Sequence, residues 1–264
     1  LWGKLRLRGT SRSNSGMGEE LGYMLGSFAR LVRAYEDRLA SLGVTFLLSD
    51  AVEGIERTDD GLVLKTRKGS AAASTVLVAA PVPDYLDIAG GILEEQESQA
   101  LRRLRATAAI CTVLELERSF TPYYWLNIAD DEMPFGGLIE HTNYIPSERY
   151  GGRHILYISN YLFPDHELYS ASKSQVLRRY EPALTRINPE FDSSWILASH
   201  HFRADYAQPV VTSGYKEHMP SFSSSVPGLY LCSMANIYPE DRGMNYAIAY
   251  GEKVAALMLE DLST

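Results

Sequence analysis

The segment YPEDRGMNYAIAYG, residues 238–251, has the residue types and spacing best suited to ligand binding. Acidic residues, an Arg and Gly243 precede apolar residues at helical spacing, which predicts a helix from about Gly243 to Glu260. The apolar run at residues 228–234 predicts a buried strand before it. A strand, a loop, a Gly and a helix start direct backbone N–H groups and the helix dipole at an anionic or electron-rich ligand. An ordinary capped helix at the surface is the alternative.

The six histidines form no metal-binding pattern. His200 and His201 are adjacent, so on a strand their side chains point to opposite faces. The other four lack partners at helical spacing, and the sequence has no HExxH motif. It also has no GxSxG elbow, no Cys–His signature and no GxxxxGK[ST] loop. We therefore predict no metal site, no acyl-transfer nucleophile and no P-loop.

The segment GMGEELG, with Gly16, Gly18 and Gly22, imitates a dinucleotide-binding fingerprint. That fingerprint requires a buried apolar strand directly before its first Gly. Here the preceding residues, KLRLRGTSRSNS, are charged and then loop-like, which a central parallel strand does not tolerate. We interpret the segment as a flexible Gly-rich lead-in.

The composition is that of a soluble globular protein: 264 residues, 45% hydrophobic and 22% charged, enough for one large domain or two modest ones. A net charge of −8 without a basic patch beyond the first residues argues against nucleic acid as a partner. The longest apolar run, TVLVAAPV, is far too short to span a bilayer, and no signal peptide opens the chain. Cys111 and Cys232 lack Cys-x-x-Cys spacing, which favours a reducing, cytoplasmic setting. A chain that opens on Leu1 is expected to be a fragment.

The residues before about 90 predict an α/β unit on a mostly parallel sheet. Its expected elements are an amphipathic helix over residues 21–42 ended by Gly43, a strand over 44–49, a hairpin over 52–66 with Asp60-Gly61 as its turn, and a buried strand over 73–82.

The middle of the chain predicts an α+β block with a mostly antiparallel sheet. A helix over residues 96–105 comes first, followed by a long strand over 106–117, further short strands, and one helix from Ser172 to Ile187. The simplest arrangement is a domain of residues 91–225 inserted between residues 1–90 and 226–264 of another domain.

Tyrosines are plentiful, 17 in all, and most are expected in the core or on half-buried strands. A Tyr-lined cleft in the inserted block suits a flat, cyclic or sugar-bearing small molecule. His141, Asn143, Tyr157 and Tyr206 are the predicted substrate-site residues, because they are polar or aromatic and fall on its expected strands. No side chain stands out as a general base.

Three segments resemble the flavin-dependent amine oxidase superfamily, which includes protoporphyrinogen oxidases and phytoene-type desaturases. They are LVRAYEDRLASLGVTFLLSDAVEGIERTDDGLVLKTRKGSAAASTVLVAAPV, FRADYAQPVVTSGY and the tail PGLYLCSMANIYPEDRGMNYAIAYGEKVAALML. The resemblance covers nearly the whole chain after about Leu21. It implies part of a split, Rossmann-like FAD-binding domain, residues 1–90 and 226–264, interrupted by a substrate-binding domain, residues 91–225.

The resemblance also assigns residues to FAD. Val52 would meet the adenine end through its backbone, and Ser233 and Met234 would lie beside the ribityl–pyrophosphate portion. The start of the last helix would face the isoalloxazine N1–C2=O edge, where its dipole would stabilise negative charge on the reduced flavin. The residues of this helix start are Arg242, Gly243, Met244 and Asn245.

Three features depart from the family pattern. The N-terminal strand with its Gly-rich pyrophosphate loop is missing, so we expect the C-terminal portion of a longer flavoprotein, inactive and poor at binding FAD by itself. Ser233-Met234 stands where Gly-Asp or Gly-Glu is usual, which removes an acidic ribityl contact. The strand over residues 106–117 has no Lys, which favours a desaturase or protoporphyrinogen-oxidase style of reaction over amine oxidation.

The leading hypothesis is therefore an FAD-dependent oxidoreductase that transfers a hydride from a C–H or C–N centre of a small organic substrate to flavin. One alternative is a non-redox flavoenzyme that acts on a nucleotide sugar, similar to UDP-galactopyranose mutases, with Arg153, Arg203 and Arg242 clamping a pyrophosphate. Another is a non-catalytic binding domain. The sequence predicts neither the substrate, the electron acceptor nor the oligomeric state.

Overall fold

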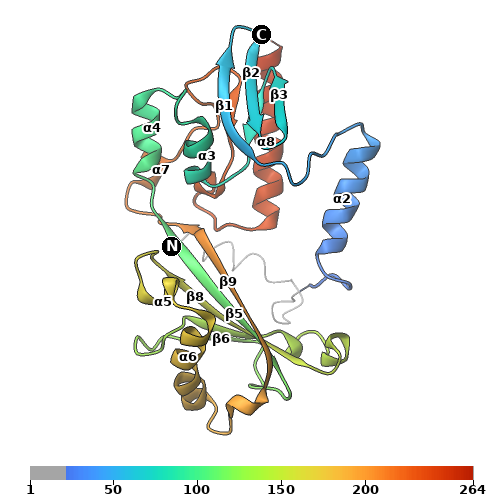
Figure 1. Cartoon of the computed structure of the whole chain (residues 1–264), viewed down its shortest axis with the longest axis vertical. Helices are drawn as coiled ribbons and strands as arrows, with labels where there is room; N and C mark the ends of the chain where they lie inside the picture. The colour runs from blue at the N-terminus through green and yellow to red at the C-terminus, as the bar shows by residue number, and fades with distance from the viewer. Residues whose placement is uncertain (1–21, 264) are drawn as a thin grey trace, which may run out of the picture. The chain divides into compact units, whose positions relative to one another are not determined.

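The computed structural model describes residues 22–263, a mixed α/β chain whose two larger sheets are antiparallel. The chain divides into two compact units (Figure 1). The first combines residues up to Arg102 with those from Lys216 onward, and the second is Arg103–Tyr215. Gly16 and Gly18 of the predicted lead-in lie outside the described residues. It stays a prediction that residues 1–90 and 226–264 bind FAD and that residues 91–225 bind the substrate.

The first unit contains a three-stranded antiparallel sheet, a two-stranded parallel sheet and several helices. Its strands are β1 (Val52–Thr58), β2 (Gly61–Thr66), β3 (Gly69–Ala73), β4 (Val76–Val78) and β10 (Leu229–Leu231). Its helices are α2 (Ala29–Ser41), α3 (Val82–Ala89), α4 (Glu95–Arg102), the 3-10 helix η4 (Met234–Asn236) and α8 (Met244–Leu262). The short helix α7 (Tyr215–His218) lies at the sequence boundary between the units.

The predicted hairpin is confirmed as β1 paired with β2. Thr58 pairs with Gly61, so the turn is Asp59-Asp60, one residue earlier than predicted. β3 extends the hairpin to three strands and was not predicted, because its small residues, GSAAA, lack strand alternation. Within residues 22–263 the expected mostly parallel sheet is reduced to one pair, β4 with β10.

Helix α2 confirms the predicted helix in its central part and ends as expected. Gly43 has φ +88°, and the N–H of Val44 donates to the carbonyl of Leu39 at 3.1 Å, the pattern of a Gly-terminated helix. The prediction that α2 buries its apolar face was wrong, since no residue of α2 is buried against the described chain. The predicted strand over residues 44–49 is also wrong. No described strand pairs with this segment, so its backbone lacks the hydrogen bonds to a neighbouring strand that define a β-strand.

The second unit is a five-stranded antiparallel sheet in the order β6-β7-β8-β5-β9, with one long helix. Its strands are β5 (Ala106–Leu116), β6 (Trp125–Asn127), β7 (Gly137–Glu140), β8 (His154–Leu162) and β9 (Ile196–Pro209). Its helices are α5 (Glu167–Ser170), α6 (Lys173–Ile187) and the 3-10 helices η1 (His141–Asn143), η2 (Ser147–Tyr150) and η3 (Ser193–Trp195). The predicted antiparallel sheet, long strand and helix are confirmed.

From Thr107 to Leu116, strand β5 alternates between half-buried and buried residues. Its buried side chains pack with those of β7 and β8 and with α6, which covers this face of the sheet (Figure 1). The buried residues that β5 and α6 contribute are Ala108, Ile110, Leu114, Leu116, Val176, Tyr180, Ala183 and Leu184. On the opposite face of the sheet the residues of β5 are half-buried, and those of β9 that pair with them from Ala198 to Ala204 are half-buried or exposed.

None of the helices in the part of the chain that the structure describes is both long and apolar enough to cross a membrane.

We expect Leu114→Ala to lower the free energy of unfolding by about 2–5 kcal/mol, because Leu114 is fully buried between the sheet and α6. The matched control is Leu197→Ala on β9, whose side chain is 54% exposed and which should change it by at most about 0.5 kcal/mol. Urea denaturation of both variants measures the difference. Equal losses would contradict this assignment of the core.

Candidate functional site

Helix α8 begins without a side-chain cap. Gly243 is its N-cap residue and has an extended backbone, with φ −178° and ψ 162°, and it provides no side-chain cap hydrogen bond. Met244 is 45% exposed, and Gly243 and Asn245 are exposed as well. The first N–H groups of this 19-residue helix therefore present a partial positive charge that no capping side chain of the described chain neutralises.

The turn between β10 and α8 is held by its own side chains. Ser233 caps η4: its hydroxyl accepts a hydrogen bond from Ala235 N at 3.2 Å, and Asn236 Oδ1 accepts one from Ser233 N at 2.8 Å. Asn236 is buried and also donates to the Pro220 carbonyl at 3.0 Å. The Ser233 hydroxyl is thus used to shape this turn, and Met234 follows it as the first residue of η4.

Val52 lies at the first pair of the β1–β2 hairpin, opposite Thr66, and the register shifts between Val52 and Gly54. Its side chain is half-buried. The predicted cofactor residues thus come from three places in the first unit: the irregular end of a hairpin, the turn after a buried parallel strand, and an uncapped helix start. Backbone groups at an irregular strand end and at a helix start are free of ladder constraints, which is compatible with a large anionic cofactor such as FAD.

Tyr157 occupies the centre of the half-buried face of the five-stranded sheet. It pairs with Val113 of β5 on one side and with Ile139 of β7 on the other, and directly paired residues share a face. Trp125 pairs with Ile139, and His200 pairs with Val113, so both lie on this face too. The sheet therefore presents a row of aromatic and apolar side chains on the side that α6 does not cover.

His141 lies close to Tyr157, although not on a strand as predicted. It begins η1 directly after β7, and its ring centroid is 6.2 Å from that of Tyr157 and 5.3 Å from that of Tyr150. His141 Nε2 and the Tyr150 hydroxyl form a hydrogen bond. Burial lowers the pKa of His141, which favours the neutral imidazole. The structure therefore brings two of the four predicted substrate residues together.

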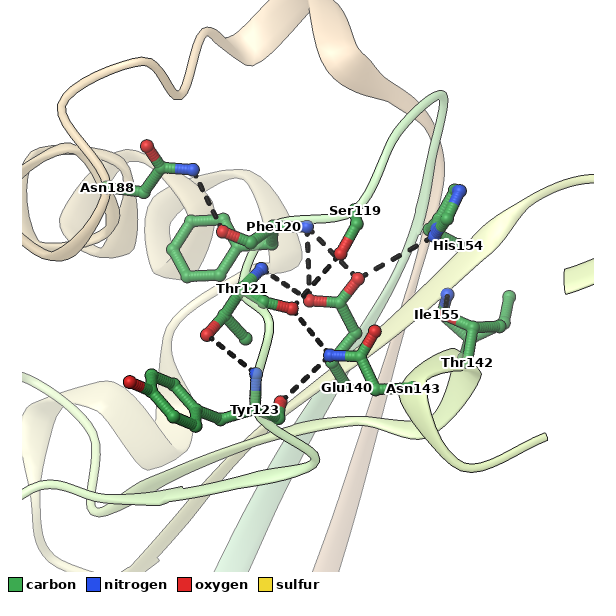
Figure 2. Close-up of polar contacts among 10 residues, drawn as sticks. All are labelled: Ser119, Phe120, Thr121, Tyr123, Glu140, Thr142, Asn143, His154, Ile155 and Asn188. Atoms are coloured by element: carbon green, nitrogen blue, oxygen red, sulfur yellow. Dashed lines mark hydrogen bonds and ion pairs between the residues drawn. The ribbon is translucent and has the colours of Figure 1, made fainter. Parts of the chain in front are cut away.

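Asn143 lies at the other end of η1. Its amide donates to the carbonyls of Thr121 and Tyr123, which orders the loop before β6 (Figure 2). The prediction that it lies on a strand was wrong, because the chain turns into a 3-10 helix straight after β7.

Glu140 anchors the same loop and was missed by the sequence analysis. Its carboxylate is fully buried and accepts hydrogen bonds from Phe120 N at 3.0 Å and from Thr121 N at 2.6 Å (Figure 2). His154 Nδ1 lies 3.7 Å from Glu140 Oε1, which is an ion pair only when the imidazole is protonated. A Glu that closes an otherwise apolar strand, GLIE, is the sequence signal that could have identified it.

Tyr206 lies on β9, where the register with β5 shifts between Thr107 and Ala109. Its hydroxyl is buried and has no hydrogen-bond partner among the described residues. Burial, and secondarily Tyr215, raise the pKa of Tyr206 to about 12, so the phenol stays protonated at neutral pH. Strand β5 separates β9 from β8, which carries Tyr157.

The arginines of the predicted pyrophosphate clamp are engaged in different places. Arg153 donates to the Glu115 carboxylate, and His200 Nε2 contacts the same carboxylate at 2.8 Å. Glu115 belongs to the half-buried face of β5, whereas Arg203 pairs with Ile110 on the face that α6 covers. Arg242 lies beside Asp241 in the first unit. The two arginines of the second unit therefore do not converge on one ligand.

A family model described as "Flavin containing amine oxidoreductase" matches residues 7–259. The chain belongs to this family. Within residues 22–263 of the family member, no group of three or more His, Cys, Asp or Glu side chains could hold a metal ion.

Solved structures share the fold of this flavin-containing amine oxidoreductase at low sequence identity. Cyclohexylamine oxidase from Brevibacterium oxydans IH-35A has 15% identity and a TM-score of 0.68, over 90% of this chain and 53% of that one. A protein of Exiguobacterium sp. 255-15, suggested to be a protoporphyrinogen oxidase, has 16% identity and a TM-score of 0.68, over 87% and 51%. Reduced UDP-galactopyranose mutase has 13% identity and a TM-score of 0.58, over 74% and 42%. No match was found among curated protein sequences.

This member of the family therefore spans about half the length of the solved structures that it matches, as the coverage of 51% and 53% shows.

We expect Glu140→Gln to lower the free energy of unfolding by about 2–4 kcal/mol, because one carboxylate oxygen becomes an NH₂ group that faces backbone N–H donors in a buried site. Glu148→Gln, an exposed Glu on η2, is the matched control and should change stability by at most about 0.5 kcal/mol. Thermal or urea unfolding measures both. A variant as stable as the control would show that the carboxylate does not hold the loop.

We also expect the stability contributed by Glu115 to depend on pH. Hydrogen bonds from His200 and then Arg153 hold the pKa of Glu115 below its usual value of about 4.3. A carboxyl whose folded pKa is lowered stabilises the fold above its unfolded pKa, and this contribution disappears as the pH falls through the folded pKa. The difference in stability between wild type and Glu115→Gln should therefore shrink from about pH 6 to about pH 3.

Urea denaturation at several pH values tests this, with Glu117→Gln as the control for loss of one negative charge at a side chain that is 57% exposed. A stability difference for Glu115→Gln that stays constant over this range would contradict the linkage.

Proposed function

We propose that the protein is an FAD-dependent oxidoreductase that removes a hydride from a C–H or C–N centre of a small organic substrate. The observation that carries this proposal is the uncapped start of α8 behind Gly243, in a chain that the family model matches over residues 7–259. When bound, the flavin supplies the hydride acceptor, so the protein contributes placement and electrostatics.

In this proposal the first unit holds the cofactor. The backbone N–H groups of Met244 and Asn245 face the electron-rich edge of the flavin ring, and the dipole of α8 favours negative charge there. The turn shaped by Ser233 and Met234 lies along the ribityl–pyrophosphate portion, with the peptide groups rather than an acidic side chain as its contacts. Arg242 adds a positive charge next to the helix start, and the backbone of Val52 meets the adenine end.

The second unit supplies the surface for the substrate. Tyr157 and His141 lie together beside the half-buried face of the sheet, and the neutral imidazole of His141 can accept or donate a hydrogen bond without adding charge. Trp125, 55% exposed, extends this aromatic row at the sheet edge. A flat or cyclic, mostly apolar substrate fits such a surface. Tyr206 is a further candidate contact through its unpaired hydroxyl.

Strand β5 contains no Lys, so we favour a desaturase or protoporphyrinogen-oxidase style of reaction over amine oxidation. The isolated chain is proposed to bind FAD poorly and to be inactive. The two widely spaced cysteines, Cys111 and Cys232, which are both free, support a cytoplasmic location.

The second candidate is a non-redox reaction on a nucleotide sugar, which the similarity in fold to UDP-galactopyranose mutase favours. The arrangement of arginines argues against it, because Arg153 is committed to Glu115 and Arg203 lies on the other face of the sheet.

The test of the proposal is the visible absorbance spectrum of the natural protein in its full length, purified without added cofactor. Flavin bands that bleach with dithionite are the expected result. A protein that stays colourless after FAD is added would overturn the proposal and leave the non-catalytic binding domain. Conversion of a nucleotide sugar by the reduced protein, without net oxidation, would favour the second candidate.

We expect Gly243→Leu to weaken FAD binding by the full-length protein about tenfold or more, because a side chain at the helix start occupies the space of the ligand. The one close contact of a Cβ atom there is the movable Asn245 Oδ1, at 2.7 Å, and its other neighbours lie at 3.9 Å, so the fold itself should tolerate it. Gly251→Leu is the matched control, since a Cβ at this other α8 glycine meets nothing within 4 Å. Flavin content per protein measures both, and equal contents would refute the placement.

A further inference from the structure

A groove of about 460 Å³ lies between the start of α6 and the edge strand β9. Its lining consists of Ser172, Lys173, Ser199, His200, His201, Phe202 and Arg203. Ser199, His201 and Arg203 alternate along β9 and pair with Leu114, Thr112 and Ile110, so they point to the face that α6 covers. The groove is thus built by one strand edge and one helix start.

Two cations enter the groove without a carboxylate partner in residues 22–263. Lys173 Nζ donates to the Ser199 carbonyl at 3.0 Å, and the Arg203 guanidinium donates to the Ala171 carbonyl. An ammonium has three donors and a guanidinium five, so each keeps donors beyond these single bonds. Two acidic residues of the same sheet have other partners: Asp205 accepts a hydrogen bond from Tyr169, and Glu115 is held by Arg153 and His200.

The start of α6 increases this positive charge. Its first residue is Lys173 and its first turn has no acidic residue, the reverse of the usual preference at the positive end of a helix dipole. Ser172 and Gln175 form a capping box, so the helix itself is well formed there.

His201 has a donor or acceptor position that nothing in the described chain satisfies. Its Nδ1 lies 3.0 Å from the Thr112 hydroxyl, while its Nε2 is buried and has no hydrogen-bond partner in residues 22–263. Burial, and then the charges of Arg203 and Lys173, lower the pKa of His201.

We propose that this groove binds a phosphoryl group, through Lys173 and Arg203, with His201 beside it. A tetrahedral oxyanion can accept hydrogen bonds from several directions at once, which suits an ammonium and a guanidinium that come from two elements. The volume exceeds that of the phosphoryl group, which leaves room for an attached organic part. Inorganic phosphate and a phosphate monoester share the recognised chemistry.

The test is a titration of the full chain with inorganic phosphate at constant ionic strength, followed by NMR of the histidine side chains, with His201 assigned from a His201→Gln variant. We expect phosphate to shift the His201 resonance and to raise the pKa of His201, because the anion offsets the two cations. Lys173→Met and Arg203→Met should each weaken phosphate binding about tenfold. Phenyl phosphate in a parallel titration distinguishes the two sources: tighter binding indicates a monoester, and equal binding indicates free phosphate.

Arg186→Met is the matched control, because it removes one cation from the last turn of the same helix, where Arg186 pairs with Asp130 at 2.8 Å. It should leave phosphate binding unchanged. Thermal unfolding of each variant establishes that all are folded. The proposal is overturned if phosphate does not shift His201, or if Arg186→Met weakens binding as much as the two groove variants do.

Discussion

The two-sided pattern of β5 is the constraint on which the second unit depends. The strand lies between β8 and β9, and its alternate residues are sealed against α6 or left half-buried. A shift of one residue would exchange the two faces, so burial of Ile110, Leu114 and Leu116 fixes the register of both neighbours. That register is what places Tyr157, Trp125 and His200 on one face and His201 and Arg203 on the other.

The buried carboxylate of Glu140 holds the loop that leads into the edge strand β6. Backbone N–H groups in a loop need hydrogen-bond acceptors, and here the negatively charged carboxylate accepts their hydrogen bonds. Asn143 and Asn188 complete the arrangement by donating to the carbonyls of the same loop (Figure 2). These side chains together hold the loop that precedes the aromatic edge strand β6.

The first unit is organised differently, because much of its apolar surface is exposed. Of the 19 residues of α8 only Val254 is buried, and α2 has no buried residue. Phe46, Leu47 and Leu48 between the helix and the first strand are 42%, 65% and 71% exposed. The hydrophobic effect favours the burial of exposed apolar side chains such as these. The chain also spans only about half of the solved structures that share its fold, with coverage of 51% and 53%.

The sequence by itself determined the elements whose information is local. The sequence predicted β5 as a long strand and α6 as a helix, apolar residues at helical spacing predicted α8, and Gly43 predicted the end of α2, since each depends on neighbours along the chain. It misplaced the strand over residues 44–49, because a strand exists only with a partner that accepts its hydrogen bonds. Only the tertiary structure decided that His141 meets Tyr157, that Asn143 supports a loop, that Glu140 is buried, and that Lys173 and Arg203 share a groove. These are contacts between residues distant in sequence, and they are set by strand register and packing rather than by local preference.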